Sequence, residues 1–513
     1  MARITDVSEL VRIAADDSPE RLAVVEAGGR SLTWVALEDE VARVATGLGH
    51  LGALAGHRVM LVLGNRLEFV TSYLGVLRAQ AVAVPVNPES TADELERMLG
   101  DCGARLVLAE PGTAATVREA ARRLASPPRV VLVGDAGDGE TSYAELVSAA
   151  PRPVPPLRDP DKLAALLYTS GTSGLPRGAM LSHRALLANI EQVAGVEPPM
   201  ISGDDVVLGV LPLFHVYGLN AVLGGVLRHR AKLLLAERFD PQGTLEIIED
   251  EACSVVPVAP AVFAHWLPVE HLAERLGPVR LLLSGSAPLS PEVVEQFVAV
   301  SGVDVHQGYG LTEAAPVVTS TLCSEVVQPG SVGTALPGIE VRLVDDRGGV
   351  PGGEDPGEIS IRGDNLFSGY WPDGAGGPDA DGWWATGDVG FLDPSGDLFL
   401  VDRLKELVIV SGFNVYPSEV EDVIREVPGV ADAAVIGAPD EVTGESVVAY
   451  VVPAGRADGV QDAVRSHVGT RLARFKQPAR IEVVEELPLT VTGKVQKGRL
   501  RGIERRRALG LLE

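Results

Sequence analysis

The sequence TSGTSGLPRG (Thr169–Gly178) combines three glycines with two threonines and two serines. It follows the apolar run KLAALLY, a candidate for a buried strand, and precedes MLSHRALLANIEQV, whose apolar spacing predicts a helix. A strand, a glycine-rich turn and a helix are typical of a phosphate cradle, because glycines let backbone N–H groups converge on an anion. No GK[ST] closes the turn, so it is not a Walker A loop. Taken alone, the stretch fits a flexible connection nearly as well as a phosphate site.

Strands and helices alternate in the part of the chain that precedes this stretch. RVMLVLG (Arg58–Gly64) is a short apolar run that ends in glycine, as buried parallel strands do. NRLEFVTSYLGVLRA follows it with helical spacing. Further runs of the first kind are AVAVPVNP, ARLVLAEP and RVVLVGD. The pattern predicts a doubly wound α/β architecture with its sites at the carboxyl ends of the strands.

The pattern changes twice in the second half of the chain. From about Gly333, the short alternating strands IEVRLVDD, GEISIRG and GDLFLVD are separated by segments rich in glycine, proline and aspartate, which predicts a small β-rich subdomain. From about Leu404 a mixture of helical and strand-like segments predicts a separate, smaller α+β domain. We therefore expect two domains, a large α/β domain over residues 1–403 and a smaller one over residues 404–513.

Composition limits the classes of function. The 513 residues carry a formal net charge of −26, which disfavours nucleic acid as a partner because phosphate backbones require a basic surface. The three cysteines Cys102, Cys253 and Cys323 lie far apart and predict neither disulfides nor a metal site. The chain start lacks the apolar core of a signal peptide, and no apolar run reaches the roughly 20 residues of a membrane span. We expect a cytoplasmic protein without a transmembrane segment.

Two further segments carry residues suited to a ligand site. PLFH places His215 inside an apolar run, where a core histidine with one hydrogen-bonded nitrogen is the alternative. LLLSGSAPLS is a strand that ends in a turn of small residues, among them Ser286 and Ala287. Such a turn lets a flat ring approach the backbone closely, although many turns of this kind bind nothing.

The segment QGYGLTEAAPV follows the strand-like run VDVH and offers three different groups in one place. The aromatic ring of Tyr309, the hydroxyl of Thr312 and the carboxylate of Glu313 suit a base, a phosphate and a divalent cation. Later in the chain, TGD places Asp388 in a turn before a strand, and DRLKE carries Arg403. Both residues suit the hydroxyls of a ribose, unless they are charged residues of solvated turns.

The order and content of YTSGTSGLPRG, PLFH, SGSAPL, GYGLTE, TGD, DRLKE and TGK resemble the AMP-forming adenylating enzymes (the ANL superfamily), and within them the acyl-CoA synthetases. The matching blocks run from about Leu166 to Lys497. Similar enzymes activate a carboxylate with ATP, release pyrophosphate and hold an acyl-adenylate, from which a thiol, usually that of coenzyme A, displaces AMP. The resemblance thus implies ATP, Mg²⁺ and coenzyme A as ligands.

The resemblance also implies a role for each matching residue. Four residues are implied in catalysis: Lys494 bridging the substrate carboxylate and the adenylate, Thr312 at the α-phosphate, Glu313 as the Mg²⁺ carboxylate, and His215 orienting the acyl group. For the nucleotide, the resemblance implies that the Thr169–Gly178 loop binds the β- and γ-phosphates and that Ser286, Ala287 and Tyr309 surround adenine. It implies that Asp388 and Arg403 bind the ribose, and that Gly412 lies beside the pantetheine of coenzyme A. Within the loop the implied binding residues are Thr169, Ser170, Gly171, Thr172, Ser173, Gly174, Arg177 and Gly178.

In such enzymes the small domain swings between two poses, one for each half-reaction. One pose brings in the loop that carries Lys494, and the other brings in Ser411–Phe413 for thioester formation, with Lys405 at the hinge. Arg177 departs from the family pattern, which has lysine there. Arginine keeps the positive charge and adds donors in a fixed plane, so we expect activity to be retained.

Three alternatives stay open. The chain resembles acyl-AMP ligases that load a carrier protein, although the insertion that such relatives often carry is not evident between Gly338 and Asp402. It also resembles enzymes that activate aryl or amino acids. The non-enzyme alternative is a catalytically silent nucleotide-binding protein. Four intact residues argue against it: Glu313, Asp388, Arg403 and Lys494.

The acid itself is predicted from the segments expected to line its pocket. VAPAVFAHW (Val258–Trp266) and EAAPVV (Glu313–Val318) are small or apolar and offer no cation for a second carboxylate. We therefore expect an apolar acid, a medium- or long-chain fatty acid, with aryl acids as the alternative. We expect a monomer or a homodimer, with the acid, ATP and coenzyme A as small-molecule partners.

Overall fold

The computed structural model describes residues 4–155, 157–170, 176–287, 289–345, 348–351, 355–403, 406–410, 413–440, 444–472, 474–490 and 493–508. The chain divides into two compact units. The first comprises residues 1–169, 176–340 and 362–384, and the second comprises residues 170–175, 341–361 and 385–513. The boundary expected between residues 403 and 404 stays a prediction.

The larger sheet of the first unit has nine strands among the described residues, in the order β16-β15-β14-β13-β12-β10-β11-β1-β2. The six strands from β14 to β1 pair in parallel, and the strands at both edges pair antiparallel. The bounds are β1 (Leu22–Glu26), β2 (Ser31–Thr33), β10 (Val206–Gly209), β11 (Lys232–Leu235), β12 (Val255–Val258), β13 (Leu281–Ser284), β14 (Val305–Gly310), β15 (Val317–Ser320) and β16 (Thr334–Ala335).

The second sheet of this unit has seven strands over the residues described, in the order β7-β6-β5-β3-β4-β8-β9. The pairs from β7 to β8 are parallel, and the short apolar strands β3, β4 and β5 are almost entirely buried, as the sequence predicts. The bounds are β3 (Arg58–Val62), β4 (Val82–Pro85), β5 (Leu106–Ala109), β6 (Arg129–Leu132), β7 (Thr141–Ser142), β8 (Leu163–Ser170) and β9 (Pro176–Ser182).

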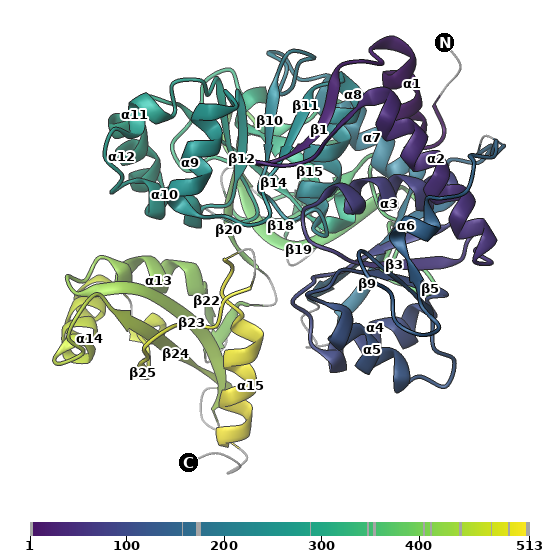
Figure 1. Ribbon diagram of the computed structural model, residues 1–513. Helices are drawn as coiled ribbons and strands as arrows, with labels where there is room; N and C mark the ends of the chain where they lie inside the picture. The colour runs from purple at the N-terminus through teal and green to yellow at the C-terminus, as the bar shows by residue number, and fades with distance from the viewer. Residues whose placement is uncertain are drawn as a thin grey trace. The chain divides into compact units, whose positions relative to one another are not determined.

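Helices cover these sheets (Figure 1). Their bounds are α1 (Glu9–Asp17), α2 (Trp34–His50), α3 (Leu67–Arg78), α4 (Ala92–Cys102), α5 (Ala114–Arg122), α6 (Tyr143–Leu146), α7 (His183–Ala194), α8 (Gly225–His229), α9 (Pro241–Asp250), α10 (Ala261–Trp266), α11 (Leu272–Arg275) and α12 (Pro291–Ser301). Three further elements are the π-helix η1 (Tyr217–Gly224) and the 3₁₀ turns η2 (Thr312–Ala314) and η3 (Thr321–Cys323).

Helix α3 lies where the two sheets of the first unit meet. It contacts β1 of the nine-stranded sheet and β3 and β4 of the seven-stranded sheet. Every residue from Leu67 to Leu77 is buried, which is the burial expected of a helix enclosed on all sides. The turn that starts α3 therefore has neighbours from both sheets.

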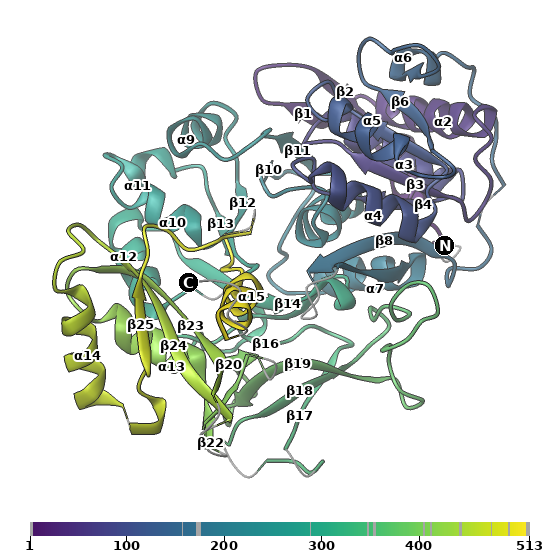
Figure 2. The same cartoon turned by 90° about the horizontal axis from the view of Figure 1, so that it is seen from below.

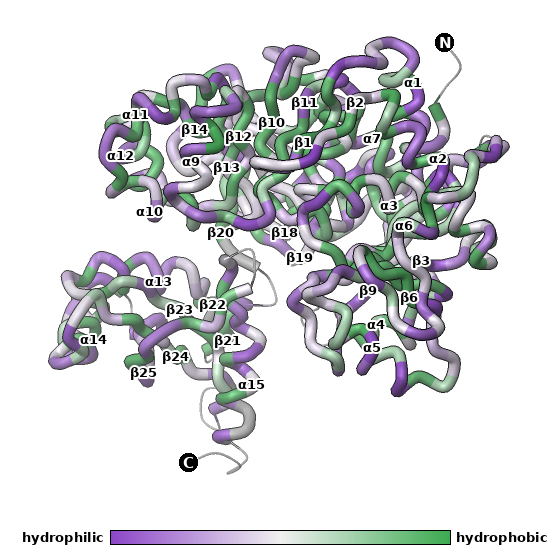
Figure 3. The backbone as a smooth tube through the Cα atoms, in the orientation of Figure 1, coloured by the Kyte–Doolittle hydropathy of each residue, from purple (hydrophilic) through white to green (hydrophobic). Residues whose placement is uncertain are grey.

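Helices α4 and α5 pack side by side on one face of the seven-stranded sheet (Figure 1). Thr91 and Glu94 form a capping box at the start of α4, and Gly103, in a left-handed conformation, ends the helix. Leu95, Leu99 and other apolar side chains of α4 join the buried sheet residues in one core. In Figure 3 the tube is mostly hydrophobic along the strands behind α4 and α5, whereas hydrophobic and hydrophilic residues are mixed along the two helices.

A smaller sheet has four strands in the described part of the chain, in the order β17-β18-β19-β20. It is the β-rich subdomain expected from about Gly333. Its bounds are β17 (Glu340–Val344), β18 (Gly357–Arg362), β19 (Trp383–Leu392) and β20 (Leu398–Arg403).

The rest of the second unit is a five-stranded sheet, counted over described residues, with helices on both faces. Its strands and helices are β21 (Val408–Val410), β22 (Phe413–Val415), α13 (Pro417–Arg425), β23 (Val430–Asp440), β24 (Gly444–Pro453), α14 (Val460–Arg471), η4 (Arg474–Lys476), β25 (Arg480–Val483) and α15 (Lys497–Ala508). Successive residues of β23 alternate between the faces. Ala433 and Val435 pack with α13 and α14, whereas Ala434 and Ile436 pack with α15. Figure 2 shows β23, β24 and β25 side by side.

The predicted fold class, a large α/β part with a smaller α+β part, is confirmed. Across the ranges described above, none of the helices has the length and apolar character that a bilayer crossing requires.

Candidate functional site

The glycine-rich stretch connects two strands rather than a strand and a helix. It leaves β8 at Ser170 and enters β9 at Pro176, and the expected helix begins only at His183. Of the loop residues expected to bind phosphate, Gly171, Thr172, Ser173 and Gly174 lie outside the described residues. The Thr169 hydroxyl donates to the carbonyl oxygen of Arg177 at 3.4 Å, so the two ends of the loop meet.

Gly178 is closely surrounded by two side chains. A Cβ at this position would lie 2.8 Å from Cδ1 of Leu166 and 3.4 Å from Cβ of Trp371. The Trp371 N–H donates to the Gly178 carbonyl at 2.8 Å. The strand that leaves the loop is therefore packed directly against the segment that contains Tyr370.

Tyr370 joins the loop cation to the candidate metal carboxylate. The guanidinium carbon of Arg177 lies 3.5 Å from the centroid of the Tyr370 ring, a cation–π stack. The hydroxyl of the same ring donates to Oε1 of Glu313 at 2.7 Å. Burial, and then the Glu313 carboxylate, raise the pKa of the Tyr370 phenol, so it stays a donor well into alkaline solution.

The backbone around Glu313 is held by several partners. Glu313 is only 8% exposed, and its carbonyl oxygen accepts from the Phe367 N–H at 2.9 Å. The amide of Asn365 donates to the Ala314 carbonyl at 2.7 Å, and the amide of Asn220 donates to the Ala315 carbonyl at 2.7 Å. Thr312 and Glu313 are therefore presented by a turn whose conformation is fixed from outside.

The expected adenine residues lie on neighbouring strands. Ser286 and Ala287 follow β13, and Ser286 has a φ of +78°, a left-handed conformation that is unusual for serine. Tyr309 lies inside β14, 6% exposed, rather than after the strand as its sequence suggested. Because β13 and β14 pair in parallel, both segments lie at the carboxyl edge of the sheet, where ligands of such sheets bind.

His215 lies between β10 and the π-helix η1. It is half-buried, and its Nδ1 accepts from the Tyr217 N–H at 3.3 Å. Its carbonyl oxygen accepts from the Leu219 N–H at 2.9 Å. Tyr217 packs against Gly285, where a Cβ would lie 2.7 Å from Cε1 of the ring, and burial raises the pKa of its phenol. The π-helix, a feature often found at functional sites, was not predicted.

The segments expected to line the acyl pocket contribute largely to the core. Val262, Phe263 and Trp266 are buried, and Phe263 packs edge-on against Phe297 with ring centroids 4.9 Å apart. Ala314 and Val318 are also fully buried. The apolar character of these segments is thus explained by packing, which weakens the reason for expecting a long aliphatic acid.

Asp388 and Arg403 are brought together in the second unit. They are paired residues on the antiparallel strands β19 and β20. Asp388 lies within a strand, not in the expected turn, and its N–H donates to the Thr386 hydroxyl at 3.1 Å. Gly412 and the expected hinge residue Lys405 lie outside the described residues.

Lys494 closes a tight turn in the second unit. Its N–H donates to Oγ1 of Thr490 at 3.0 Å, and its carbonyl accepts from the Thr490 N–H at 2.7 Å. Gly493 supplies the left-handed φ of +78° that this turn requires. Three residues further on, the ammonium of Lys497 pairs with Glu421 at 2.8 Å and with Glu406 at 3.1 Å.

Within the described ranges, three or more histidine, cysteine or acidic side chains nowhere gather to hold a metal ion. The single carboxylate of Glu313 still suits Mg²⁺, because that ion is commonly bound by one or two carboxylates together with substrate phosphates and water.

Comparison with known proteins places the chain in a family. Residues 11–371 match the model of the AMP-binding enzyme family, and residues 419–494 match that of its C-terminal domain. The chain belongs to the AMP-binding enzyme family. A protein named 4-coumarate–CoA ligase 3 from Oryza sativa subsp. japonica is 34% identical over 92% of this chain and 87% of its own length.

Two solved structures are similar as well. ATP-bound MatB from Rhodopseudomonas palustris has a TM-score of 0.88 and 33% identity, over 97% of this chain and 98% of that one. A fatty acyl CoA synthetase from Mycobacterium tuberculosis has a TM-score of 0.76 and 30% identity, over the same shares of the two chains. The expected resemblance to AMP-forming acyl-CoA synthetases is confirmed, and so is the prediction that the protein is an enzyme.

Proposed function

We propose that this enzyme activates an aryl-substituted carboxylic acid with ATP and transfers the acyl group to coenzyme A, releasing AMP and pyrophosphate. The observation that carries the nucleotide half is the arrangement of Glu313, Tyr370 and Arg177, a carboxylate and a cation held on two sides of one phenol. The family match supports the same chemistry.

In the first step, a carboxylate oxygen of the acid bonds to the α-phosphorus of ATP, and the bond from that phosphorus to the bridging oxygen breaks. Negative charge shifts to the leaving pyrophosphate, so cations placed there stabilise the transition state. We assign Arg177 and the rest of the Thr169–Gly178 loop to the β- and γ-phosphates, and Thr312 to the α-phosphate. Glu313 would hold Mg²⁺, which neutralises phosphate charge when it is bound.

The remaining assignments follow the sequence prediction. Tyr309, Ser286 and Ala287 contact adenine, while Asp388 and Arg403 hold the ribose. Lys494 bridges the acid and the α-phosphate during adenylation. In the second step the thiol sulfur of coenzyme A bonds to the acyl carbon and AMP leaves, with Gly412 beside the pantetheine.

The acid is proposed from two observations. The rice relative is named for 4-coumarate, an acid whose carboxyl group is attached to an aromatic ring through a short alkene. The large apolar side chains of Val258–Trp266 are used in the core, as Phe263 and Trp266 show. An aryl acid, which the sequence left as the alternative, therefore has better support than the fatty acid expected first. His215 and Tyr217, on the segment that enters η1, are proposed to contact it.

Pyrophosphate release across a panel of carboxylic acids, with and without coenzyme A, tests the proposal. Aryl and arylalkenoic acids should give higher kcat/KM than octanoate or palmitate, and coenzyme A should yield the thioester. Preference for the aliphatic acids would refute the assigned acid class. An adenylate that coenzyme A fails to discharge would favour a carrier-protein acceptor, and no release with any acid would favour a silent nucleotide-binding protein.

Two variants test the assignment of the lysine. Lys494→Ala should lower adenylate formation by about 100-fold or more, as the loss of one preorganised charge contact at a transition state does. The exposed Lys162 provides the matched control, since Lys162→Ala should keep the wild-type rate. Adenylate formation by Lys494→Ala at the wild-type rate would remove Lys494 from the mechanism.

A further inference from the structure

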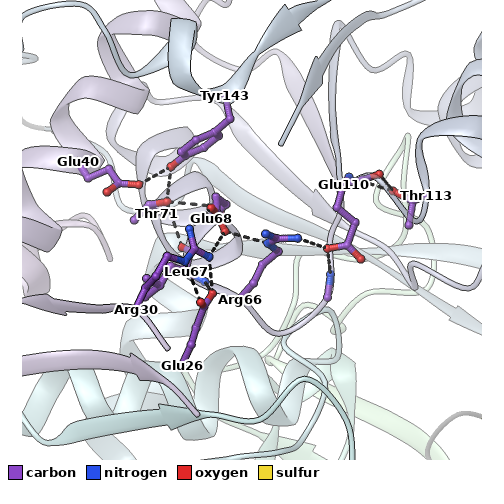
Figure 4. Close-up of polar contacts among 11 residues, drawn as sticks. Glu26, Arg30, Glu40, Arg66, Leu67, Glu68, Thr71, Glu110, Thr113 and Tyr143 are labelled. Carbon is purple, nitrogen blue, oxygen red and sulfur yellow. Dashed lines mark hydrogen bonds and ion pairs between the residues drawn. The ribbon is translucent and has the colours of Figure 1, made fainter. Parts of the chain in front are cut away.

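A network of ion pairs surrounds the turn between β3 and α3 (Figure 4). The Glu68 carboxylate, 5% exposed, accepts from Arg30 at 2.5 Å and from Arg66 at 2.8 Å. Burial alone would raise the pKa of Glu68, but the two guanidinium groups lower it to about 2. The carboxylate is therefore ionised at all ordinary pH values and holds both arginines.

The same network fixes the backbone of the turn (Figure 4). Arg30 also pairs with Glu26 at the end of β1, and the Glu26 carboxylate accepts from the Leu67 N–H at 2.9 Å. On the other side, Glu110 after β5 pairs with Arg66 at 3.0 Å and accepts from the Gly64 N–H at 3.3 Å. Residues at the ends of strands from both sheets thus hold the backbone of the turn at Leu67 and at Gly64. One residue of this turn lies between Gly64 and Arg66.

That residue is Asn65, and its side chain bonds to a distant segment. Its Nδ2 donates to the carbonyl oxygens of Gly209 at 3.0 Å and Leu211 at 2.9 Å, while its Oδ1 accepts from the Leu213 N–H at 2.9 Å. Asn65 is 7% exposed. An amide can donate two hydrogens and accept through its oxygen, so all three bonds suit its capacity, and water has little access to replace them.

The segment held by Asn65 leads directly to the candidate acyl-contact residues. The carbonyl of Pro212, between the two bonded residues Leu211 and Leu213, accepts from the His215 N–H at 3.1 Å. Nδ1 of His215 in turn accepts from the Tyr217 N–H at the start of η1. A displacement at Leu213 is thus transmitted through one hydrogen bond to the backbone of His215, and through a second from the His215 ring to the backbone of Tyr217.

We infer that Asn65 is a positioning residue for His215, holding the Gly209–Leu213 segment in register with the β3–α3 turn that the ion-pair network fixes. The inference rests on the proposed role of His215 at the acyl group. Asn65 itself bonds only to backbone and acts through the segment.

The test is a double-mutant cycle in the full-length enzyme with Asn65→Ala, His215→Ala and the combined variant. The kinetic constants for the acid and for ATP are measured by pyrophosphate release. Asn65→Ala should lower kcat/KM for the acid by about 10- to 100-fold, the loss produced by displacing a contacting group by about 1 Å. The KM for ATP should stay within about twofold. In the His215→Ala background the same substitution should add less than about twofold, because coupled residues are not additive.

A structural role alone would give a different pattern. It would lower the melting temperature and would reduce activity equally in both backgrounds. Thr46→Ala is the control, since Thr46 is 6% exposed and its hydroxyl accepts from the Arg152 N–H in another part of the unit. This control should lower the melting temperature without changing kcat/KM for the acid.

Three outcomes of this cycle would contradict either the inference about Asn65 or the proposed role of His215. Additive losses, or an unchanged kcat/KM in Asn65→Ala, would overturn the inference. An unchanged kcat/KM in His215→Ala would instead overturn the proposed role of His215. Where Asn65→Ala does not fold, Asn65→Asp carries the same cycle, because it keeps the acceptor for the Leu213 N–H and the size of the side chain.

Discussion

Removing one oxygen atom, in Tyr370→Phe, should separate the two contacts that Tyr370 makes. The variant keeps the ring beneath Arg177 and loses the hydroxyl that donates to Glu313 at 2.7 Å. A hydrogen bond to a charged group contributes about 1.5–3 kcal/mol, and Glu313 is too deeply buried for water to replace the donor fully. We take the lower end, about 1.5 kcal/mol, because a bound metal ion would compensate part of the loss. This corresponds to a decrease of about 10-fold in kcat/KM for ATP.

A second substitution measures the cation–π contact between Arg177 and the Tyr370 ring. Tyr370→Leu removes the ring as well, and a cation–π contact contributes about 0.5–2 kcal/mol, so a further decrease of about 2- to 30-fold is expected. Both variants should require more Mg²⁺ for half-maximal pyrophosphate release. The matched control is Tyr450→Phe, which removes a phenol that donates to the Glu504 carboxylate in the second unit.

The pH dependence provides a further check. Because the pKa of Tyr370 is raised, the wild-type phenol stays protonated between about pH 6 and pH 9, and the ratio of wild-type to variant activity should be constant over that range. A Tyr370→Phe enzyme with wild-type kcat/KM for ATP and wild-type Mg²⁺ dependence would refute the reasoning.

Arg177→Ala should raise the KM for ATP by about 10-fold, equivalent to 1.4 kcal/mol, in the pyrophosphate assay; an unchanged ATP dependence would contradict its assignment. Burial tends to raise the pKa of Asp205, but Arg280 and neighbouring donors lower it to about 2, so its contribution to stability, complete above about pH 4, should be lost as pH falls toward 2. Melting temperatures of wild type and Arg280→Ala across this range check it, and equal slopes would contradict it. Gly333→Ala should unfold the first unit or lower its stability by more than about 4 kcal/mol, because φ is +80° and a Cβ would lie 2.0 Å from a backbone carbonyl carbon. Gly302→Ala, with φ of +71° and open space, should cost only about 1 kcal/mol in the same denaturation experiment.

The elements with strong local signals were predictable from the sequence. RVMLVLG forms β3, and the helical spacing after it forms α3, because both patterns depend on burial that repeats along the chain. Asp388 and Arg403, both expected at the ribose, are paired on neighbouring strands, although the sequence placed Asp388 in a turn. Threonine and glycine around this aspartate resemble a turn, and only pairing with β20 makes the segment a strand.

The partners of the candidate site residues were not predictable. Tyr370 lies in SGYWPDG, whose glycine and proline indicate irregular structure, and nothing nearby indicates that its hydroxyl reaches Glu313. Asn65 is the first residue of NRLEFVTSYLGVLRA, whose spacing indicates only a helix. Its role depends on bonds to Gly209, Leu211 and Leu213, and no local pattern encodes such contacts. A tyrosine or an asparagine gains such a role only from what the fold brings beside it.

The bonds of Asn65 have a consequence for synthesis of the chain. Asn65 precedes Leu213 by 148 residues, and ribosomes add about 5–20 residues per second, so Leu213 follows Asn65 by about 7–30 s. The last strand of the seven-stranded sheet ends at Ser182, so that sheet can be complete while the amide of Asn65 still bonds to water. The order of translation therefore lets the seven-stranded sheet form before Asn65 can bind the segment that leads to His215, and no fragment that stops before Leu213 can contain that segment in its final form.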